Sequence, residues 1–514
     1  MTADVFAFTT NVEMHAASST PRPAVRFVEV FVTPVSLGRG GGAGHRPGRM
    51  MPGPGPDSET DAVTDATTTG PTTRRGLSLT AICAAAGMVW LAFADLGVAV
   101  PAIADDLDAE MAALQWANNA FSLVTGALVI AAGKFGDIFG RRRMLSIGIV
   151  LFAAFSLVAA LAPNVGTLIA GRALMGIGAA LILPATLALI PAEFSGPAEL
   201  TAFGVWQAVA WGGQAIGPAV GGLLTDTLGW PWLFWINLPV AALTYLALRV
   251  STPESLDPHA SRRIDWLGLV TIGLAIFALL FGLTAGPGVG WSDPLVVVLL
   301  VVSVLLAFSW YAIERRAAEP LVRLDLFRLR PYDAALTANL VMNLAFAGLS
   351  YLLVLWLQNV RGYDAVQAGL LLLPATVGIF VFIPRGSRMS ARRGGRMPVL
   401  LGLVLLAGGL FVLGFLTDDV SLWLLAAGLL VIGVGLGLLS TPISDTAVGE
   451  VPPELSGAAA GFFKMSSMVG GALGVAVLSG LSEGFSTGGT LVITGLIVLA
   501  ALLAVRQLWP KPHA

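Results

Sequence analysis

A series of long apolar runs begins at Leu77 and continues almost to the end of the sequence. Each run has roughly 18–25 residues, enough for a helix to cross a hydrocarbon core about 30 Å thick. The chain is 56% hydrophobic and 12% charged, whereas about a quarter of the residues of a soluble protein are charged. We therefore predict an all-α membrane protein. The fourteen expected transmembrane helices are 79–104, 113–134, 144–162, 166–190, 200–224, 233–250, 266–286, 294–313, 333–357, 365–385, 398–416, 421–443, 457–481 and 488–507.

Composition and motif content also narrow the function. The net charge is −2 and no basic patch is interleaved with aromatic residues, so we expect no nucleic-acid partner. Cys83 is the only cysteine, which excludes an intramolecular disulfide and predicts a small core residue. The sequence holds no phosphate-binding loop, metal cluster or nucleophile motif. We expect no cofactor, no metal and no catalytic residue, and hence no enzyme.

The first 76 residues are rich in Gly, Pro, Thr and Ser. Such a segment buries too little apolar surface to offset its ordering entropy, so we expect a disordered tail. Its short apolar run 25–37 is interrupted by Pro34 and has no cleavage-like site after it, which argues against both a span and a signal peptide. Met50 or Met51 is an alternative start.

Arginines gather in alternate connections between the runs, and acids occupy the others, where Arg361 is the only base. By the positive-inside rule both termini are cytoplasmic. The connections assigned to the cytoplasm hold Arg74, Arg75, Arg141, Arg142, Arg143, Arg249, Arg262, Arg263, Arg315, Arg316, Arg323, Arg328, Arg330, Arg385, Arg388, Arg392, Arg393 and Arg396.

Three motifs in the first half resemble a known family. Residues 133–143 read Gly-Lys-Phe-Gly-Asp-Ile-Phe-Gly-Arg-Arg-Arg, which resembles the loop signature Gly-x-Leu-x-Asp-x-x-Gly-Arg-Arg of the major facilitator superfamily. Residues 172–180 in span 4 resemble its second signature. In span 5 a third motif is similar to the one that marks the antiporter branch; it comprises Gly213, Gly217, Pro218, Gly221 and Gly222. The chain after its tail is therefore similar to the fourteen-span drug:proton antiporters.

The resemblance implies a major facilitator fold of two six-helix bundles plus two inserted helices. The expected divisions are a tail 1–76, an N-terminal bundle 77–250, linker helices 251–332, a C-terminal bundle 333–507 and a cytoplasmic tail 508–514. The segment 384–396 supports this repeat because it echoes the loop 133–143, with Ser390 about where the acid would stand.

The same resemblance implies efflux of small amphipathic compounds in exchange for protons, by alternating access, from a monomer in the lipid bilayer of the cytoplasmic membrane. Three lysines against 26 arginines indicate a GC-rich bacterial gene. An exporter dedicated to one endogenous metabolite is the alternative. A membrane-embedded enzyme or sensor would need clustered catalytic or metal residues, or an added soluble domain, and the sequence shows neither.

The loop signature comprises Gly133, Asp137, Gly140, Arg141 and Arg142. Asp137 stands four residues before Arg141, so the two can pair on one helix face. In the family the equivalent acid contacts the start of span 13, which is residues 456–457 in this chain. We hypothesise that Asp137 and Arg141 latch the outward-facing state. The alternative is that the arginines only anchor the topology.

Ionisable side chains inside a span are costly and are usually paired or functional. The family's span 1 acid aligns with Ala92, and Asp95 is the nearest acid, one helical turn further on. Arg172 in span 4 lies at a similar depth, roughly 9–14 Å below the outer surface at about 1.5 Å per residue. We predict that Asp95 and Arg172 form a charge pair and that protonation of Asp95 releases Arg172. A static structural pair is the alternative.

Lys464 in span 13 has no acid at matching depth, and Asp445 is the closest one. It either snorkels to the inner surface or faces the substrate cavity and favours anionic or neutral compounds. Several amides within the spans are candidates for the same cavity, although polar residues also hold spans together. They are Asn118, Asn119, Gln207, Gln214, Asn339 and Asn343. The glycines of span 5 likewise fit either ordinary helix packing or an antiport-specific role.

Overall fold

The computed structural model describes residues 71–255, 265–317, 324–363, 365–415 and 421–509, and every regular element within these ranges is a helix. The first half and the inserted pair contain α2(Pro71–Ala92), α3(Leu96–Leu107), α4(Met111–Phe139), α5(Arg141–Ala160), α6(Val165–Glu193), α7(Pro197–Leu228), α8(Trp232–Trp235), α9(Asn237–Ser251), α10(Trp266–Val289) and α11(Pro294–Glu314). The second half contains η1(Leu324–Arg328), α12(Arg330–Asn359), α13(Ala365–Leu371), α14(Leu373–Arg393), α15(Arg396–Leu413), α16(Leu422–Ser444), η2(Asp445–Gly449), η3(Pro453–Leu455), α17(Ser456–Gly484) and α18(Thr487–Leu508).

Thirteen helices of the described part are long and apolar enough to cross a membrane. The predicted all-α membrane fold is therefore confirmed. The fourteenth expected span, 200–224, coincides with the 32-residue helix α7, which is not among the thirteen. The expected tail 1–76 lies mostly outside the described residues, but α2 already begins at Pro71.

Span 1 differs from its expected form, because two helices replace one. Helix α2 ends at Ala92, and α3 begins at Leu96 with Asp95 at its N-cap position. The amide of Asp95 donates to the carbonyl of Leu91 across the break. A break of this kind within a span persists only where neighbouring helices satisfy the freed backbone groups. The break therefore places polar backbone in the interior of the first half.

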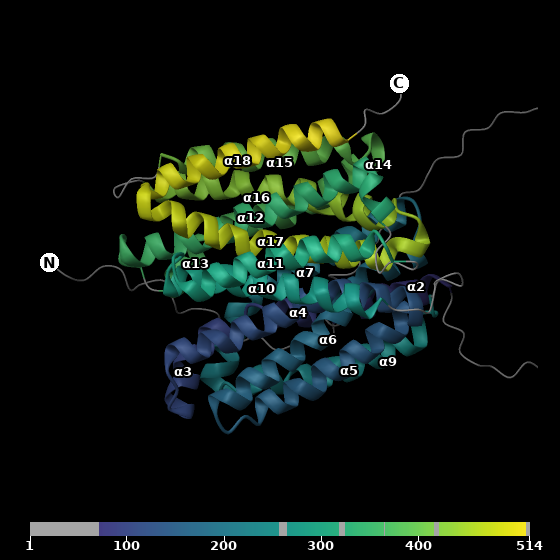
Figure 1. Cartoon of the computed structure of the whole chain (residues 1–514), viewed down its shortest axis with the longest axis horizontal. Helices are drawn as coiled ribbons and strands as arrows, with labels where there is room; N and C mark the ends of the chain where they lie inside the picture. Colours follow the sequence, from purple (N-terminus) through teal and green to yellow (C-terminus); the bar gives the residue numbers. More distant parts are fainter. Residues whose placement is uncertain (1–70, 256–264, 318–323, 364, 416–420, 510–514) are drawn as a thin grey trace, which may run out of the picture. The chain divides into compact units, whose positions relative to one another are not determined.

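Each half packs mainly on itself, as Figure 1 shows for α15, α16 and α18 in the second half and for α5, α6 and α9 in the first. The halves meet where α4 packs on α17 and where α7 packs on α14. Helix α10 contacts both α4 and α17, so the inserted pair α10 and α11 covers one seam between the halves. This arrangement matches the expected two bundles with two inserted helices.

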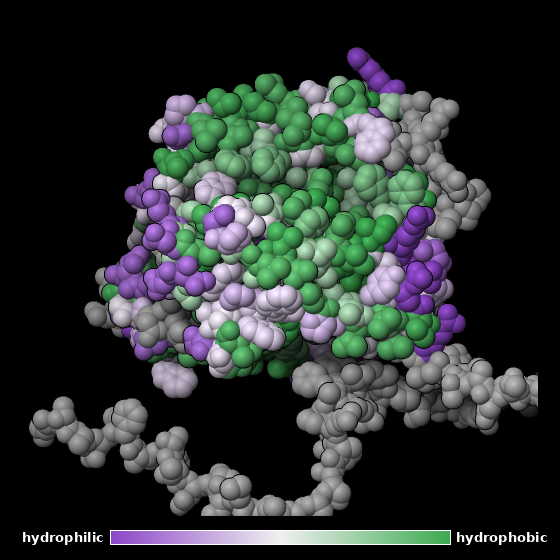
Figure 2. All heavy atoms as spheres, turned by 90° about the horizontal axis from the view of Figure 1, so that it is seen from below, coloured by the Kyte–Doolittle hydropathy of each residue, from purple (hydrophilic) through white to green (hydrophobic). Residues whose placement is uncertain are grey.

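The surface agrees with a membrane-spanning protein. Figure 2 shows one face with a broad hydrophobic area and with hydrophilic residues gathered at its two opposite ends. Helix α11 contributes several exposed apolar side chains, among them Val298, Leu305 and Phe308. We call the end of the helices that carries Arg141, Arg142 and Arg143 the arginine-rich end.

Candidate functional site

The turn between α4 and α5 forms a contact between the two halves at the arginine-rich end. The Asp137 carboxylate accepts hydrogen bonds from the backbone amides of Gly457 and Ala458, each at 3.0 Å. Those amides belong to the first turn of α17, where unpaired N–H groups and the helix dipole attract an anion. Asp137 is only 1% exposed. The predicted contact with the start of span 13 is therefore present.

Arg141 completes this contact, as its i+4 spacing predicts. Its Nη2 lies 3.0 Å from Oδ1 of Asp137 and also donates to the carbonyl of Pro453, just before α17. On the other side, the Arg141 amide donates to the carbonyl of Ser255 at 2.9 Å. The guanidinium thus joins α4 to the segment before α17, and its backbone joins the same turn to the segment after α9.

Two glycines allow α4 and α17 to approach this closely. A Cβ at Gly133 would clash with the carbonyl of Gly457, and a Cβ at Gly457 would clash with the Asp137 carboxylate. Gly140 has φ +101°, a conformation that L side chains rarely adopt, and it lets the chain turn from α4 into α5. Within the loop signature, Gly133 is thus required by the contact with α17 and Gly140 by the turn into α5.

The predicted charge pair between Asp95 and Arg172 is close but not direct. Both side chains are buried and attract each other electrostatically, yet no ion pair joins these two described residues. Arg172 instead donates to the carbonyl of Ala92 at 3.0 Å and to Oδ1 of Asn118 at 3.0 Å. The Ala92 carbonyl is available because span 1 is broken after this residue. The predicted direct pair is thus wrong in detail: the arginine binds backbone of the break that also positions Asp95.

The glycine motif of α7 packs on the same break. A Cβ at Gly213 would lie 3.1 Å from the Cβ of Trp90, and one at Gly217 would lie 2.6 Å from the Cβ of Ala94. At Gly221 it would clash with the backbone carbonyl of Asp95. Pro218 and Gly222 belong to the same helix, where Pro218 is exposed. The motif therefore fixes how closely α7 can approach the acid of span 1.

Lys464 lies inside the protein, at 4% exposed. The snorkelling alternative is therefore wrong. Its ammonium nitrogen lies 4.3 Å from the ring centroid of Trp206 on α7 and 5.2 Å from that of Trp90 on α2. No carboxylate of the described residues pairs with it. A cation of the second half is thus held by aromatic faces of the first half, a favourable interaction worth about 0.5–2 kcal/mol.

A ladder of aromatic rings connects Lys464 with Arg172. Trp90 lies 5.5 Å from Phe93, and Phe93 lies 4.6 Å from Phe121, measured between ring centroids. The guanidinium of Arg172 lies 4.4 Å from the Phe121 centroid. Two cations therefore stand at opposite ends of a continuous aromatic wall in the interior. The sequence gives no periodic signal for this wall, because its rings come from α2, from the break after α2 and from α4.

Of the six side-chain amides predicted for the substrate cavity, four make hydrogen bonds within the protein and two do not bond to the described residues. Gln207 donates to the carbonyl of Ser440 at 2.8 Å and so joins α7 to α16 across the halves. Asn339 donates to the carbonyl of Phe463 at 2.8 Å within the second half, and Asn343 donates to Asn339. Asn118 holds Arg172, as described above. The remaining two make no side-chain hydrogen bond to the described residues: they are Asn119, which is half-buried, and Gln214, which is exposed.

Two contacts at the arginine-rich end were not predicted. Ser387 on α14 donates to the carbonyl of Leu200 on α7 at 3.0 Å, so in the segment that echoes the first-half loop it is Ser387 that bonds to the other half. Nearby, Glu199 on α7 has a buried carboxylate oxygen without a hydrogen-bond partner among the described residues. Glu199 and Asp445 approach the same side of Gly449, because a Cβ built there would clash with Oε1 of Glu199 and would lie 3.0 Å from Oδ1 of Asp445. Partial burial, and then the charge of Glu450, raise the pKa of Glu199. Ionisation of these acids opposes the contact between the halves.

Comparison with known proteins identifies the family. The model of the Major Facilitator Superfamily matches residues 77–475. The chain belongs to this superfamily. Among solved structures, the human organic anion transporter MFSD10 (TETRAN) superposes with a TM-score of 0.63 at 18% identity, over 84% of this chain and 99% of that one. The superposition shows that the major facilitator fold is shared.

Three bacterial relatives of this major facilitator protein are drug-resistance proteins. It is 35% identical over 434 residues to the puromycin resistance protein pur8 of Streptomyces alboniger, covering 84% of this chain and 86% of that protein. It is 34% identical over 403 residues to the tetracenomycin C resistance and export protein of Streptomyces glaucescens, with 78% and 74% coverage. For the quinolone resistance protein NorB of Staphylococcus aureus the identity is 32% over 412 residues, with 80% and 88% coverage. The predicted family and the predicted efflux transporter in the plasma membrane are confirmed.

Proposed function

We propose that this major facilitator protein exports small amphipathic compounds in exchange for protons, as a monomer whose termini and arginine-rich end face the cytoplasm. The observation that carries the proposal is the contact of Asp137 with the first turn of α17, because it joins the two halves at the arginine-rich end through hydrogen bonds to a charged group. A contact of this kind must break when that end opens. Alternating access therefore has a defined gate in this chain.

The interior charges supply a route for coupling. Asp95 is the buried acid of span 1, and it lies in a break that Arg172 also binds through the Ala92 carbonyl. Protonation of Asp95 neutralises its carboxylate and removes the attraction between the two side chains. The lowest-energy position of the Arg172 side chain therefore changes. Because α7 packs on the Asp95 backbone through Gly221, a shift there is passed to α7 and hence to the contact of α7 with the second half.

Similarity to proteins that confer resistance to puromycin, tetracenomycin C and quinolones supports export of drug-like compounds. Each of these names gives one compound or one compound class, so the breadth of the substrate range is the property that separates a multidrug transporter from a dedicated exporter. Expression of the gene in a bacterium that lacks its major efflux pumps tests this choice. We expect reduced accumulation of several unrelated amphipathic compounds and a return to control levels when a protonophore collapses the proton gradient. Reduced accumulation of only one metabolite would favour the dedicated exporter, and no effect on any compound would contradict the proposal.

Lys464 is proposed to set the charge preference of the substrate. A buried ammonium without a carboxylate partner disfavours a second cation and favours an anionic group on the substrate. We expect Lys464→Met to reduce transport of a carboxylate substrate about tenfold, since a hydrogen bond to a charged group contributes about 1.5–3 kcal/mol, while transport of its neutral methyl ester changes little. Uptake of the matched pair into inverted vesicles measures this ratio.

Lys134→Met is the control, because Lys134 is the other lysine of the described helices and lies on α4, away from the Lys464 ring contacts. It should leave the ratio of acid to ester transport unchanged. An unchanged ratio in Lys464→Met would remove Lys464 from the substrate path and leave it as a structural contact between the halves.

A further inference from the structure

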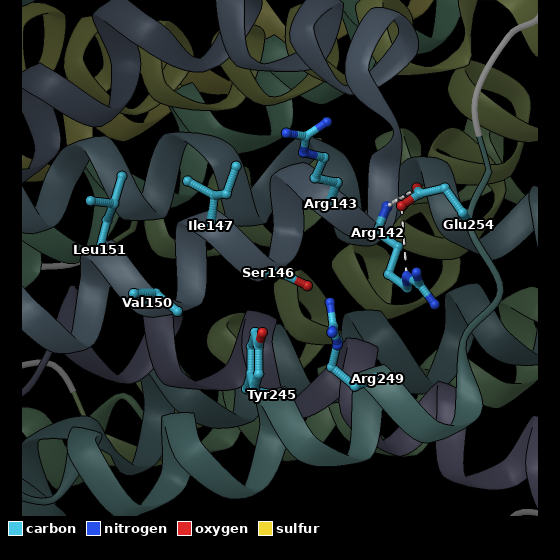
Figure 3. Close-up of a pocket in the computed structure, with 9 residues that line it drawn as sticks. All are labelled: Arg142, Arg143, Ser146, Ile147, Val150, Leu151, Tyr245, Arg249 and Glu254. Carbon is cyan, nitrogen blue, oxygen red and sulfur yellow. Dashed lines mark hydrogen bonds and ion pairs between the residues drawn. The ribbon is translucent and has the colours of Figure 1, made fainter.

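A pocket separate from the interior charges opens between α5 and α9 at the arginine-rich end (Figure 3). Its volume is about 370 Å³. In Figure 3, Ser146 of α5 faces Tyr245 and Arg249 of α9, Arg143 and Ile147 project from the other side of α5, and Glu254 lies beside Arg142. The lining residues are Arg142, Arg143, Ser146, Ile147, Val150, Leu151, Tyr245, Arg249 and Glu254.

The pocket carries excess positive charge. Glu254 is already engaged by Arg142, whose amide donates to it at 3.0 Å and whose Nε lies 3.6 Å from its second oxygen. Arg143 and Arg249 are exposed, and neither has an acid partner among the described residues. Arg249 lies over the Tyr245 ring, 5.7 Å from its centroid. Two guanidinium groups therefore remain available for an anion.

The apolar part of the wall lies on α5 and runs along the axis of that helix. Ile147, Val150 and Leu151 lie on α5 beyond Arg143, and Val150 is 53% exposed. At about 1.5 Å per residue, Leu151 stands roughly 12 Å from Arg143 along the helix. The pocket thus has a basic head at the end of the helices and an apolar flank leading toward their middle. This polarity fits an amphipathic ligand with a charged head and an alkyl chain.

We propose that the pocket binds an anionic phospholipid, with its phosphate at Arg143 and Arg249 and an acyl chain along Ile147 and Val150. Basic pockets between transmembrane helices recognise acidic headgroups, and guanidinium groups match the oxygens of a phosphate. The site adjoins the latch in sequence and in space, because Arg142 follows Arg141, and Glu254 precedes the Ser255 that binds Arg141. The bound lipid lies directly beside the gate contact.

Native mass spectrometry of the full chain, after exchange into detergent micelles with dioleoyl phosphatidylglycerol or dioleoyl phosphatidylcholine, tests the site. We expect the wild type to retain phosphatidylglycerol in preference to phosphatidylcholine. The double variant Arg143→Gln, Arg249→Gln should lose about 25-fold in phosphatidylglycerol affinity, since each surface arginine contributes about fivefold. Inorganic phosphate at millimolar concentration should not displace the lipid.

Arg315→Gln is a matched control, because Arg315 is also exposed at a helix end and lies 5.7 Å from the centroid of the Tyr311 ring, but does not line the pocket. It should bind lipid as the wild type does. If the double variant fails to fold, Val150→Trp gives a second test, because it fills the apolar flank without changing charge and should also weaken retention. Equal retention by wild type and either pocket variant would overturn the proposal, and displacement by phosphate alone would point to a soluble anion.

Discussion

Asp95→Asn should abolish efflux driven by a pH gradient while leaving downhill exchange of substrate intact. Asp95 is the acid buried at the break of span 1, where the positive charge of Arg172 attracts its carboxylate. Asparagine has nearly the same shape as aspartate but cannot take up and release a proton. A gradient of one pH unit is worth about 1.4 kcal/mol per proton, enough for about tenfold accumulation in one-for-one exchange. The variant should accumulate substrate only to about the external concentration. Accumulation in inverted vesicles at a fixed pH gradient measures this ratio.

Asp105→Asn is the control for this experiment. Asp105 lies on α3, the same helix that Asp95 caps, but it is exposed near the end of that helix. It should retain wild-type accumulation. If Asp95→Asn also retained full pH-driven accumulation, the acid would be part of a static structural pair and the proton would have to travel elsewhere.

Asp137→Ala should shift the protein from the state closed at the arginine-rich end toward the state open there. The substitution removes the carboxylate that accepts from the amides of Gly457 and Ala458. It also leaves the buried guanidinium of Arg141 without its carboxylate partner. Breaking a buried charged pair by removing one partner costs about 3–5 kcal/mol, which corresponds to more than a hundredfold change in the conformational equilibrium. Transport should fall because the closed state is no longer reached often enough.

Spin labels on α4 and α17 at the arginine-rich end measure this shift as a distance distribution. The chain is suited to the experiment because Cys83 is its only cysteine and is buried, so labelling sites can be added on a Cys83→Ala background. Lys134→Gln, one turn before Asp137 on the same helix, should leave the distribution unchanged. A wild-type distribution in Asp137→Ala would show that the arginines of this turn anchor topology and do not latch the gate.

The pairing of Asp137 with Arg141 was predictable because its determinants are local. Asp137 and Arg141 are four residues apart on one helix, and the family resemblance supplied the distant partner at residues 456–457. The apolar runs were predictable for a similar reason, since span length follows directly from bilayer thickness.

The interior site was less predictable because it depends on tertiary contacts. Depth along two helices suggested that Asp95 pairs directly with Arg172, but depth carries no information on rotation about the helix axis. The break after Ala92 turned the arginine toward a backbone carbonyl. Lys464 likewise had no visible partner in the sequence, because an aromatic ring in a membrane span is usually ordinary lipid-facing or core packing. Only the fold brings Trp90 and Trp206 to the same ammonium.

Substrate-dependent proton movement in inverted membrane vesicles tests the central claim most directly. With the vesicle lumen acidified beforehand, addition of a transported compound should alkalinise the lumen, because each exported molecule exchanges for protons. The signal should be absent in vesicles without the protein and in Asp95→Asn. Uptake of the compound without any alkalinisation of the lumen would contradict proton-coupled export.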